Sequence, residues 1–260
     1  MPPEPAALLA VLLLGAVYAR GVFTLWSRAG ADHVVRRWWQ AACFGGGSLA
    51  ILVALESPVD TLSQDLFAVH MVQHLLLIVV AAPLVVLSAP VAPVLWAMPE
   101  ASRRTVARWW RTTAPFTRPA VAFAAHSLAL WLWHVPNLYE AAIRSRGTHI
   151  FEHLTFLITA VLFWWGVIHR THRDKGVGVL YVFCLALQST FLGALLTFSP
   201  RPWYSAHLAT ALAWGLTPLE DQQLAGLIMW VPGGTVYVAA ALGLLASWLR
   251  SSSKASARSS

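Results

Sequence analysis

The amino-acid sequence predicts an all-α, polytopic membrane protein with seven transmembrane helices. Of its 260 residues, 58% are hydrophobic and only 11% are charged, whereas about a quarter of the residues in a soluble domain are charged. Several apolar stretches approach the roughly 20 residues that a helix needs to cross a bilayer. Since a backbone inside lipid must satisfy its own hydrogen bonds, these stretches are expected to be helices.

The seven spans are expected at about residues 6–27, 38–55, 66–87, 119–135, 149–168, 177–198 and 222–249. Between them there is no stretch long enough for a second core, so residues 1–250 are predicted to form one membrane domain. The leader MPPEP carries no positive charge, and the first span is therefore expected to be retained rather than cleaved as a signal peptide. The basic, low-complexity segment 251–260 is predicted to be a disordered tail.

Basic residues gather in alternate loops of this arrangement. They occur between spans one and two, three and four, and five and six, and after span seven (Arg28, Arg36, Arg37, Arg103, Arg104, Arg108, Arg111, Arg118, Arg170, Arg173, Lys175, Arg250, Lys254, Arg258). The other loops hold only Arg144, Arg146 and Arg201, and Arg20 lies within the first span. The positive-inside rule then predicts an outside N-terminus and a cytoplasmic C-terminus. Loop asymmetry explains the net charge of +7, so no nucleic-acid partner is expected.

One cytoplasmic segment, about residues 99–112, is predicted to be an amphipathic helix. Arg104, Arg108 and Arg111 fall on one side of it, and apolar residues that include two tryptophans fall on another. Such a helix lies at a membrane surface and is attracted by anionic lipid. We expect it to rest on the inner leaflet.

Two spans open with matching polar patterns. His70 and His74 stand in HMVQH at the start of span three, and His149 and His153 stand in HIFEH at the start of span five. Residues four apart share one face of a helix, and the expected topology puts both pairs at the same depth near the outer surface. Because ionisable groups in lipid usually mark function, spans three and five are expected to be neighbours whose histidine pairs face each other.

Further polar side chains fall in the same outer half, and together they predict a metal site. The expected ligands are His70, His74, His149, His153 and Asp221, with Gln73, His134, Glu152, His207, Gln222 and Met229 as auxiliary residues. Imidazole with carboxylate suits zinc or Cu(II), and methionine favours Cu(I). A haem site, a proton relay and a structural hydrogen-bond network are the alternatives. Cys43 and Cys184 fall in the inner halves of their spans and are expected to act as buried apolar residues.

Four motifs in sequence carry a family resemblance: HMVQHLLLIVVAAPLVVLSAP, WHVPNLYEAA, EHLTFLITAVLFWW and DQQLAGLIMWVPGG. In this order, across most of the chain, they resemble the CtaG-type cytochrome c oxidase assembly factors of bacteria. The resemblance implies a non-enzymatic role at the bacterial plasma membrane, with cytochrome c oxidase subunits as partners. The family's polar positions match His70, Gln73, His74, His134, Glu152, His153, Asp221, Gln222 and Gln223.

The residues and the resemblance together favour copper, held on the outer side and passed to an oxidase subunit. Two other functions stay open. HIFEH fits the H-x-x-E-H pattern of zinc enzymes, in which the glutamate activates a zinc-bound water, so a zinc-dependent membrane hydrolase is one alternative. A haem protein with histidines from two spans as axial ligands is the other. The sequence makes no prediction of the oligomeric state.

Overall fold

The computed structural model describes residues 5–27, 34–171 and 175–259. Every element in these segments is a helix, which confirms the all-α fold. The long helices are α1 (Pro5–Trp26), α2 (Val34–Glu56), α10 (Arg146–Trp165), α11 (Lys175–Thr197) and α14 (Gly234–Ser259). The shorter ones are α3 (Pro58–Leu62), α6 (Val91–Ala97), α7 (Glu100–Thr113), η3 (Ala114–Thr117), α8 (Pro119–Trp133), α9 (Pro136–Arg144) and α12 (Thr210–Ala213).

Three π-helical segments interrupt or extend the long helices. The segment η2 (Leu76–Ala81) joins α4 (Phe67–Leu75) to α5 (Ala82–Leu87), and η5 (Met229–Gly233) joins α13 (Pro218–Ile228) to α14. The third, η4 (Gly166–Arg170), extends α10. Pro232 lies inside η5, and its missing N–H removes one hydrogen bond of an α-helix. The helix continues through this position by changing its winding.

Within the described residues, six helical stretches are long and apolar enough to cross a membrane. They are Ala7–Leu25, Trp38–Glu56, Phe67–Leu87, Arg146–Arg170, Lys175–Thr197 and Pro218–Arg250. The span expected at 119–135 corresponds to α8, which has only 15 residues. At 1.5 Å per residue α8 is about 22 Å long, shorter than the roughly 30 Å of a hydrocarbon core. Length and composition thus support six spans, and the seventh stays a prediction.

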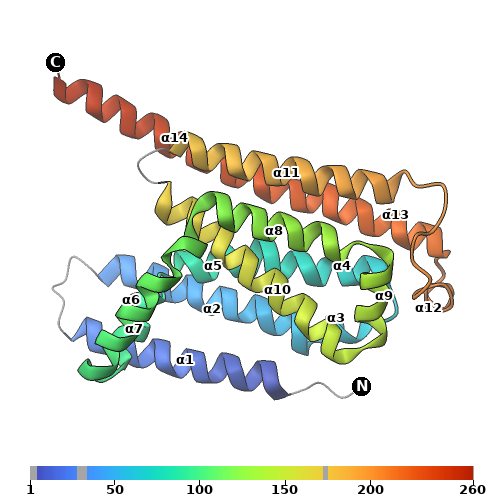
Figure 1. The fold of residues 1–260 in the computed structure, drawn as a ribbon, viewed down its shortest axis with the longest axis horizontal. Coiled ribbons are helices and arrows are strands. Elements are labelled where there is room, and N and C mark those ends of the chain that lie inside the picture. The colour runs from blue at the N-terminus through green and yellow to red at the C-terminus, as the bar shows by residue number, and fades with distance from the viewer. Residues whose placement is uncertain (1–4, 28–33, 172–174, 260) are drawn as a thin grey trace.

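The helices lie side by side in a bundle (Figure 1). In that view α1 and α2 form one side, α4, α5, α8 and α10 the middle, and α11 with α13 and α14 the other side. The short helices α3, α9 and α12 gather at one end, which we call the α9 end. At the opposite end, the α7 end, lie α6 and α7. The first helix begins near the α9 end, and α14 finishes beyond the α7 end.

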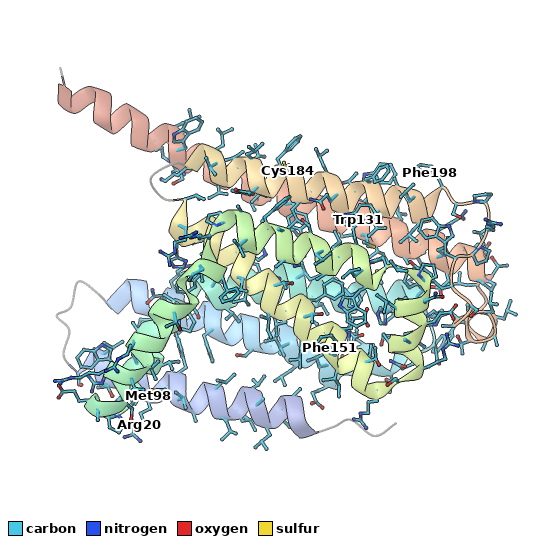
Figure 2. The ribbon with its side chains drawn as sticks, viewed as in Figure 1. Arg20, Met98, Trp131, Phe151, Cys184 and Phe198 are labelled. Carbon is cyan, nitrogen blue, oxygen red and sulfur yellow. The ribbon has the colours of Figure 1, made fainter. Side chains whose placement is uncertain are left out.

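The surface of the bundle is largely apolar. Phe151 and Phe198 are 60% and 71% exposed and point away from the helices that carry them (Figure 2). Many leucines along α1, α11 and α14 are similarly exposed. A soluble protein rarely exposes a continuous apolar surface of this extent. Together with the six apolar stretches, this makes the chain a multi-pass membrane protein.

Basic side chains mark the α7 end. The Arg103 guanidinium lies 4.5 Å from the centre of the Trp96 ring, and its Nε donates to the Met98 carbonyl at 3.0 Å. Arg20, which the sequence places within the first span, is exposed and lies close to Met98 (Figure 2). It therefore belongs to the same end as the arginines of α7.

The C-terminal segment differs from the expectation. The sequence predicted a disordered tail over 251–260, but α14 continues as a helix to Ser259, and Ser260 lies outside the described residues. The segment contains neither glycine nor proline. Its alanine, lysine and arginine residues have high helix propensity, so the preceding helix can continue through it.

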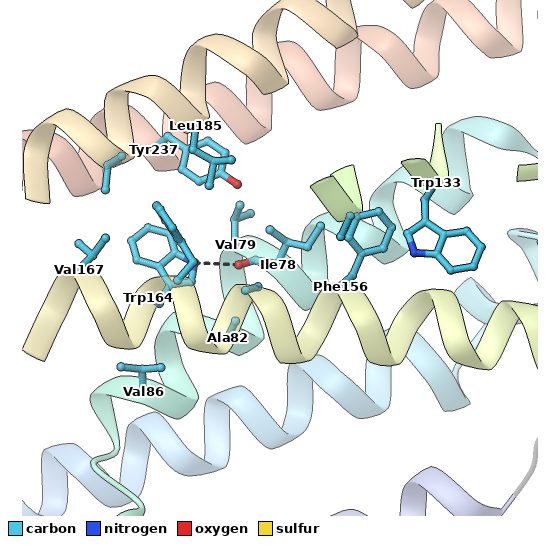
Figure 3. Packing of buried hydrophobic residues seen from close by; sticks show 14 of the residues in the cluster. Ile78, Val79, Ala82, Val86, Trp133, Phe156, Trp164, Val167, Leu185 and Tyr237 are labelled. Carbon is cyan, nitrogen blue, oxygen red and sulfur yellow. Dashed lines mark hydrogen bonds between the residues drawn. The ribbon is translucent and has the colours of Figure 1, made fainter. Parts of the chain in front are cut away.

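The packing around η2 compensates for its irregular winding. A π-helix pairs each carbonyl with an N–H five residues on, so a carbonyl is left free where the winding changes. The Trp164 indole of α10 donates to the Ile78 carbonyl of η2 at 3.0 Å (Figure 3), and both residues are buried. The Trp164 ring also stacks against Tyr237 of α14, with ring centroids 6.1 Å apart. This contact joins three helices one turn after His74.

Two glycines set the approach of α11 to α13. A Cβ atom on Gly226 would lie 2.5 Å from the Gly193 carbonyl oxygen, and one on Gly193 would lie 2.7 Å from the Gly226 carbonyl oxygen. Any side chain at either position would force the helices apart. The close crossing holds α13, and with it the start of η5, against α11.

Candidate metal centre

The two histidine pairs meet between α4 and α10. His70 and His149 have ring centroids 5.3 Å apart, and so do His74 and His153. Within each pair the centroids are 4.3 Å and 4.2 Å apart, as expected for residues one turn apart on a helix face. All four side chains are buried. The two helices are thus neighbours in register, as the sequence predicted.

Glu152 lies at the centre of this arrangement. It comes from α10, but its carboxylate reaches the histidines of α4: Oε2 lies 3.7 Å from His70 Nε2, and Oε1 lies 3.5 Å from His74 Nε2. The carboxylate is completely buried. Sequence spacing made Glu152 an auxiliary residue beside its own pair. The structure instead brings it into contact with the opposite pair.

Four residues offer ligand atoms close enough to share one ion. In His70, His149, Glu152 and His153, one nitrogen or oxygen each lies within 4.8 Å of all the others. Ligand atoms bonded to a transition metal at 2.0–2.2 Å lie about 3.3 Å apart in a tetrahedral site and about 4 Å apart when opposite. A metal ion would therefore draw the most distant of these atoms together by about 0.8–1.5 Å. His74 contacts the same carboxylate and forms the cluster's fifth member.

Much of the cluster's hydrogen-bonding capacity is unused within the described part of the chain. Atoms with no hydrogen-bond partner there include His70 Nε2, both nitrogens of His74, His149 Nε2, His153 Nε2 and both oxygens of Glu152. Most buried polar side-chain atoms in proteins have a partner. Nitrogen and oxygen atoms that could bind a metal ion thus lie close together without a hydrogen-bond partner in the described residues. This chemistry fits the residues present.

In this structure Asp221 caps the start of α4. The sequence predicted that it would be a metal ligand. Its Oδ2 accepts from the Phe67 backbone N–H at 2.8 Å, and its Oδ1 accepts from the Ala68 N–H at 2.9 Å. These groups belong to the first turn of α4, where a negative charge also interacts favourably with the helix dipole. Both oxygens are thus engaged in capping α4. Asp221 orients the helix that carries His70 and His74.

Two other expected auxiliary residues also act as structural ties. The Gln73 amide donates to the Ala54 carbonyl at 2.8 Å and to Asp60 Oδ1 at 2.9 Å, which fastens α4 to α2 and α3. The Gln222 side chain accepts from the Trp203 N–H at 2.6 Å. The hydrogen bonds of both side chains go to groups outside the cluster. The resemblance between HMVQH and HIFEH therefore does not extend to the roles of the glutamine and the glutamate.

His207 and His134 flank the cluster without joining it. His207 Nε2 shares a 2.7 Å hydrogen bond with the Tyr139 hydroxyl, and the Tyr139 ring packs edge-on against His70. Burial lowers the pKa of His207, which favours a neutral ring. His134 Nδ1 is 2.7 Å from the Leu130 carbonyl oxygen, and its own carbonyl accepts from the Tyr204 hydroxyl at 2.9 Å.

The segment between α11 and α13 is held against the α9 end by polar contacts. Glu140 accepts hydrogen bonds from the Ser205 N–H and hydroxyl at 2.9 Å and 2.6 Å, and these bonds hold the pKa of Glu140 below its usual range. Thr210 donates to the Asp65 carbonyl at 2.7 Å. The cysteines lie elsewhere: Cys43 is on α2, and Cys184 is on α11, away from the α9 end (Figure 2).

Comparison with known protein families assigns the chain to one of them. Residues 16–251 match the family model described as cytochrome c oxidase caa3 assembly factor (Caa3_CtaG). The chain belongs to this family. The family is described as one of assembly factors for a cytochrome c oxidase.

Similar proteins are longer than this chain. It is 25% identical over 264 residues to an uncharacterized protein of Mycobacterium bovis, and matches uncharacterized proteins of Mycobacterium tuberculosis and Mycobacterium leprae at the same identity. Each match covers 95% of this chain but 39% of the relative. The chain thus spans about two fifths of the length of these relatives. No solved structure matches it.

The capping role of Asp221 predicts a loss of stability that does not depend on metal. Replacing Asp221 by alanine removes two charge-assisted hydrogen bonds, so we expect the free energy of unfolding to fall by about 1.5–3 kcal/mol in chelator-treated protein. Thermal unfolding in detergent measures this. Asp221→Asn keeps one acceptor and should lose less. Unchanged stability combined with abolished metal binding would instead make Asp221 a ligand.

Proposed function

We propose that this assembly factor binds a copper ion through His70, His149, Glu152 and His153, with His74 beside them, and passes it to a subunit of the oxidase. One observation carries the proposal. Four ligand atoms from two helices lie within 4.8 Å of one another, and several of them have no protein hydrogen-bond partner in the described residues. Family membership supplies the recipient.

The chemistry of the donors favours copper among the available ions. Divalent copper exceeds the other first-row ions in affinity for sites of nitrogen and oxygen ligands. Three imidazoles and one carboxylate form such a site. An oxidase with copper centres needs a source of that metal during assembly, whereas the family description gives no recipient for zinc. Copper is therefore the cargo, and zinc is the competing ion.

The number of ligands favours transfer over permanent storage. A structural site holds its metal with a closed set of four ligands. Here four imidazoles and one carboxylate surround a space for one ion, and the carboxylate can bind through one oxygen or both. A surplus of ligands allows one bond to break while another forms, so the ion is never left without partners. This property suits a protein that must release its metal.

The proposal includes an orientation in the plasma membrane. The α9 end, with the cluster, faces outward, and the α7 end faces the cytoplasm. Support comes from the basic side chains at the α7 end, where Arg103 donates to the Met98 carbonyl and Figure 2 draws Arg20 at the same end. Cytoplasmic loops carry such an excess, and the anionic inner leaflet would attract α7. The N-terminus is then outside and the C-terminus inside.

The metal proposal predicts the effect of cluster variants on copper binding. Either His149→Ala or Glu152→Gln removes a ligand, and we expect the affinity for copper to fall by at least about 100-fold, since even loss of a residue that only orients a ligand costs about 10–100-fold. Competition titration and elemental analysis of purified protein measure this. His169→Ala, at the far end of α10, is the control and should bind normally. Unchanged binding in both cluster variants would refute the site, and a Soret band would favour haem.

Delivery predicts a defect in the oxidase itself. Cells that lack this protein should assemble an oxidase with reduced copper content and activity, partly restored by added copper salt. The Glu152→Gln variant should behave like the deletion, while His169→Ala should complement it. The measurement is metal content of the purified oxidase. An oxidase with its full copper content in the deletion strain would exclude delivery by this protein.

The orientation predicts where fused reporters work. A reporter that is active only after export should be inactive at the C-terminus and active when inserted between α9 and α10. Reporter activity in whole cells, normalised to protein amount, measures this. A reporter active only in the cytoplasm should give the reverse pattern, and an active exported reporter at the C-terminus would overturn the orientation.

A further inference from the structure

A small cavity adjoins the cluster in the middle of the bundle. The volume that the centre of a water-sized sphere can occupy is about 20 Å³. This is enough for a single small occupant. Its polar or polarisable lining comes from Met71, His74, His126, His134, Ser189, Met229 and Tyr237. The rest of the wall is apolar. His74 lines this cavity and also contacts Glu152 of the cluster.

Two of the three imidazoles around the cavity, those of His126 and His134, are held in place through one nitrogen each. His134 uses Nδ1, 2.7 Å from the Leu130 carbonyl oxygen, and His126 uses Nδ1, 2.9 Å from Thr159 Oγ1. His134 Nε2 is buried and has no hydrogen-bond partner in the described segments. Metal-ligating histidines are typically fixed in this way by a hydrogen bond at the other ring nitrogen. The free nitrogen of His134 is thus oriented for a ligand.

The lining differs chemically from the cluster. The cluster offers a carboxylate with imidazoles, whereas the residues that line the cavity offer two thioethers with imidazoles and no carboxylate. Thioether ligands select Cu(I). A monovalent ion also brings less uncompensated charge into an apolar cavity than a divalent ion does. The free-energy cost of burying an ion rises with the magnitude of its charge.

Two of the π-helical segments border this cavity. Ile78 of η2 and Met229, the first residue of η5, both line it. Such segments occur frequently at functional sites. Here the altered winding follows directly after His74 on one helix and begins at Met229 on the other, so it sets the direction in which both side chains enter the bundle.

We propose that the cavity is a second metal site that takes a soft monovalent cation, Cu(I), through the sulfur atoms of Met71 and Met229 and the free nitrogen of His134. His74 is shared with the cluster. The identity of the ion rests on the proposed function. The exchange applies to copper that reaches the cluster as Cu(I), which imidazole nitrogens also bind. One bond to a cluster ligand then breaks as one bond to a sulfur forms, and the oxidation state does not change.

The test uses the full chain in detergent with Cu(I) under anaerobic, reducing conditions, and Ag(I) as a second soft probe. Titration against a chelator of known affinity should give two ions in the unaltered protein and one in the double variant Met71→Leu/Met229→Leu. We expect at least a tenfold loss of affinity at the affected site. X-ray absorption should detect sulfur bonded to copper in the unaltered protein and none in the double variant.

Folding does not confound this comparison. Exchange of methionine for leucine conserves volume and usually costs less than about 1.5 kcal/mol, and Met98→Leu, outside the cavity, is the matched control. If the double variant fails to fold, the absorption spectrum of the unaltered protein decides the question alone. Absence of sulfur from that spectrum overturns the proposal, and indicates that any occupant is a water molecule.

A cluster variant separates this proposal from the proposed function. In Glu152→Gln the sulfur-containing site should still bind one Cu(I), because that residue does not line the cavity. Loss of sulfur ligation in this variant would mean one shared site and would overturn a second one. Conversely, sulfur ligation without any cluster binding in the unaltered protein would refute the proposed cluster site while supporting this one.

Discussion

The burial of the Glu152 carboxylate among imidazoles is the constraint on which the rest of the structure depends. Moving such groups from water into an apolar interior is costly unless partners compensate. In this bundle the carboxylate lies 3.5–3.7 Å from two histidine nitrogens, with no protein hydrogen bond to either oxygen among the described residues. A site of this kind persists only if the surrounding helices hold it rigidly and if a ligand can complete it.

The neighbouring polar residues provide that rigidity. Asp221 caps the first turn of α4 across 154 positions of sequence, and Gln73 ties the same helix to α2 and α3. Trp164 fixes the far side of η2 by its hydrogen bond to Ile78. The helix that carries His70 and His74 is thus held at its start, along its side and at its change of winding. Such support keeps metal ligands oriented where loops would not.

The chemical type of the potential ligand groups changes from the α9 end towards the middle of the bundle. Near that end lie the carboxylate and four imidazoles; beyond them, imidazoles face thioethers in a small cavity, and His74 belongs to both. A grading from hard to soft ligands changes the preferred ion without a change in the fold. It also gives the module that the family model covers, residues 16–251, an internal chemistry richer than a simple membrane anchor would need.

The sequence alone determined the helical class, six apolar stretches and the two histidine pairs, because hydrophobic length and i, i+4 spacing are local properties of a chain. It also predicted that the pairs face each other, since both open spans that run in the same direction. Only the tertiary structure decided that Glu152 reaches the opposite pair, while Asp221 binds the backbone of α4 and Gln73 binds α2 and α3 instead. Those contacts depend on the rotation of each helix about its axis and on which helices are neighbours. Close packing at the Gly193–Gly226 crossing and the winding of the π-helical segments help to set the rotation and the neighbours of these helices. Neither property is encoded in the spacing of residues along one helix.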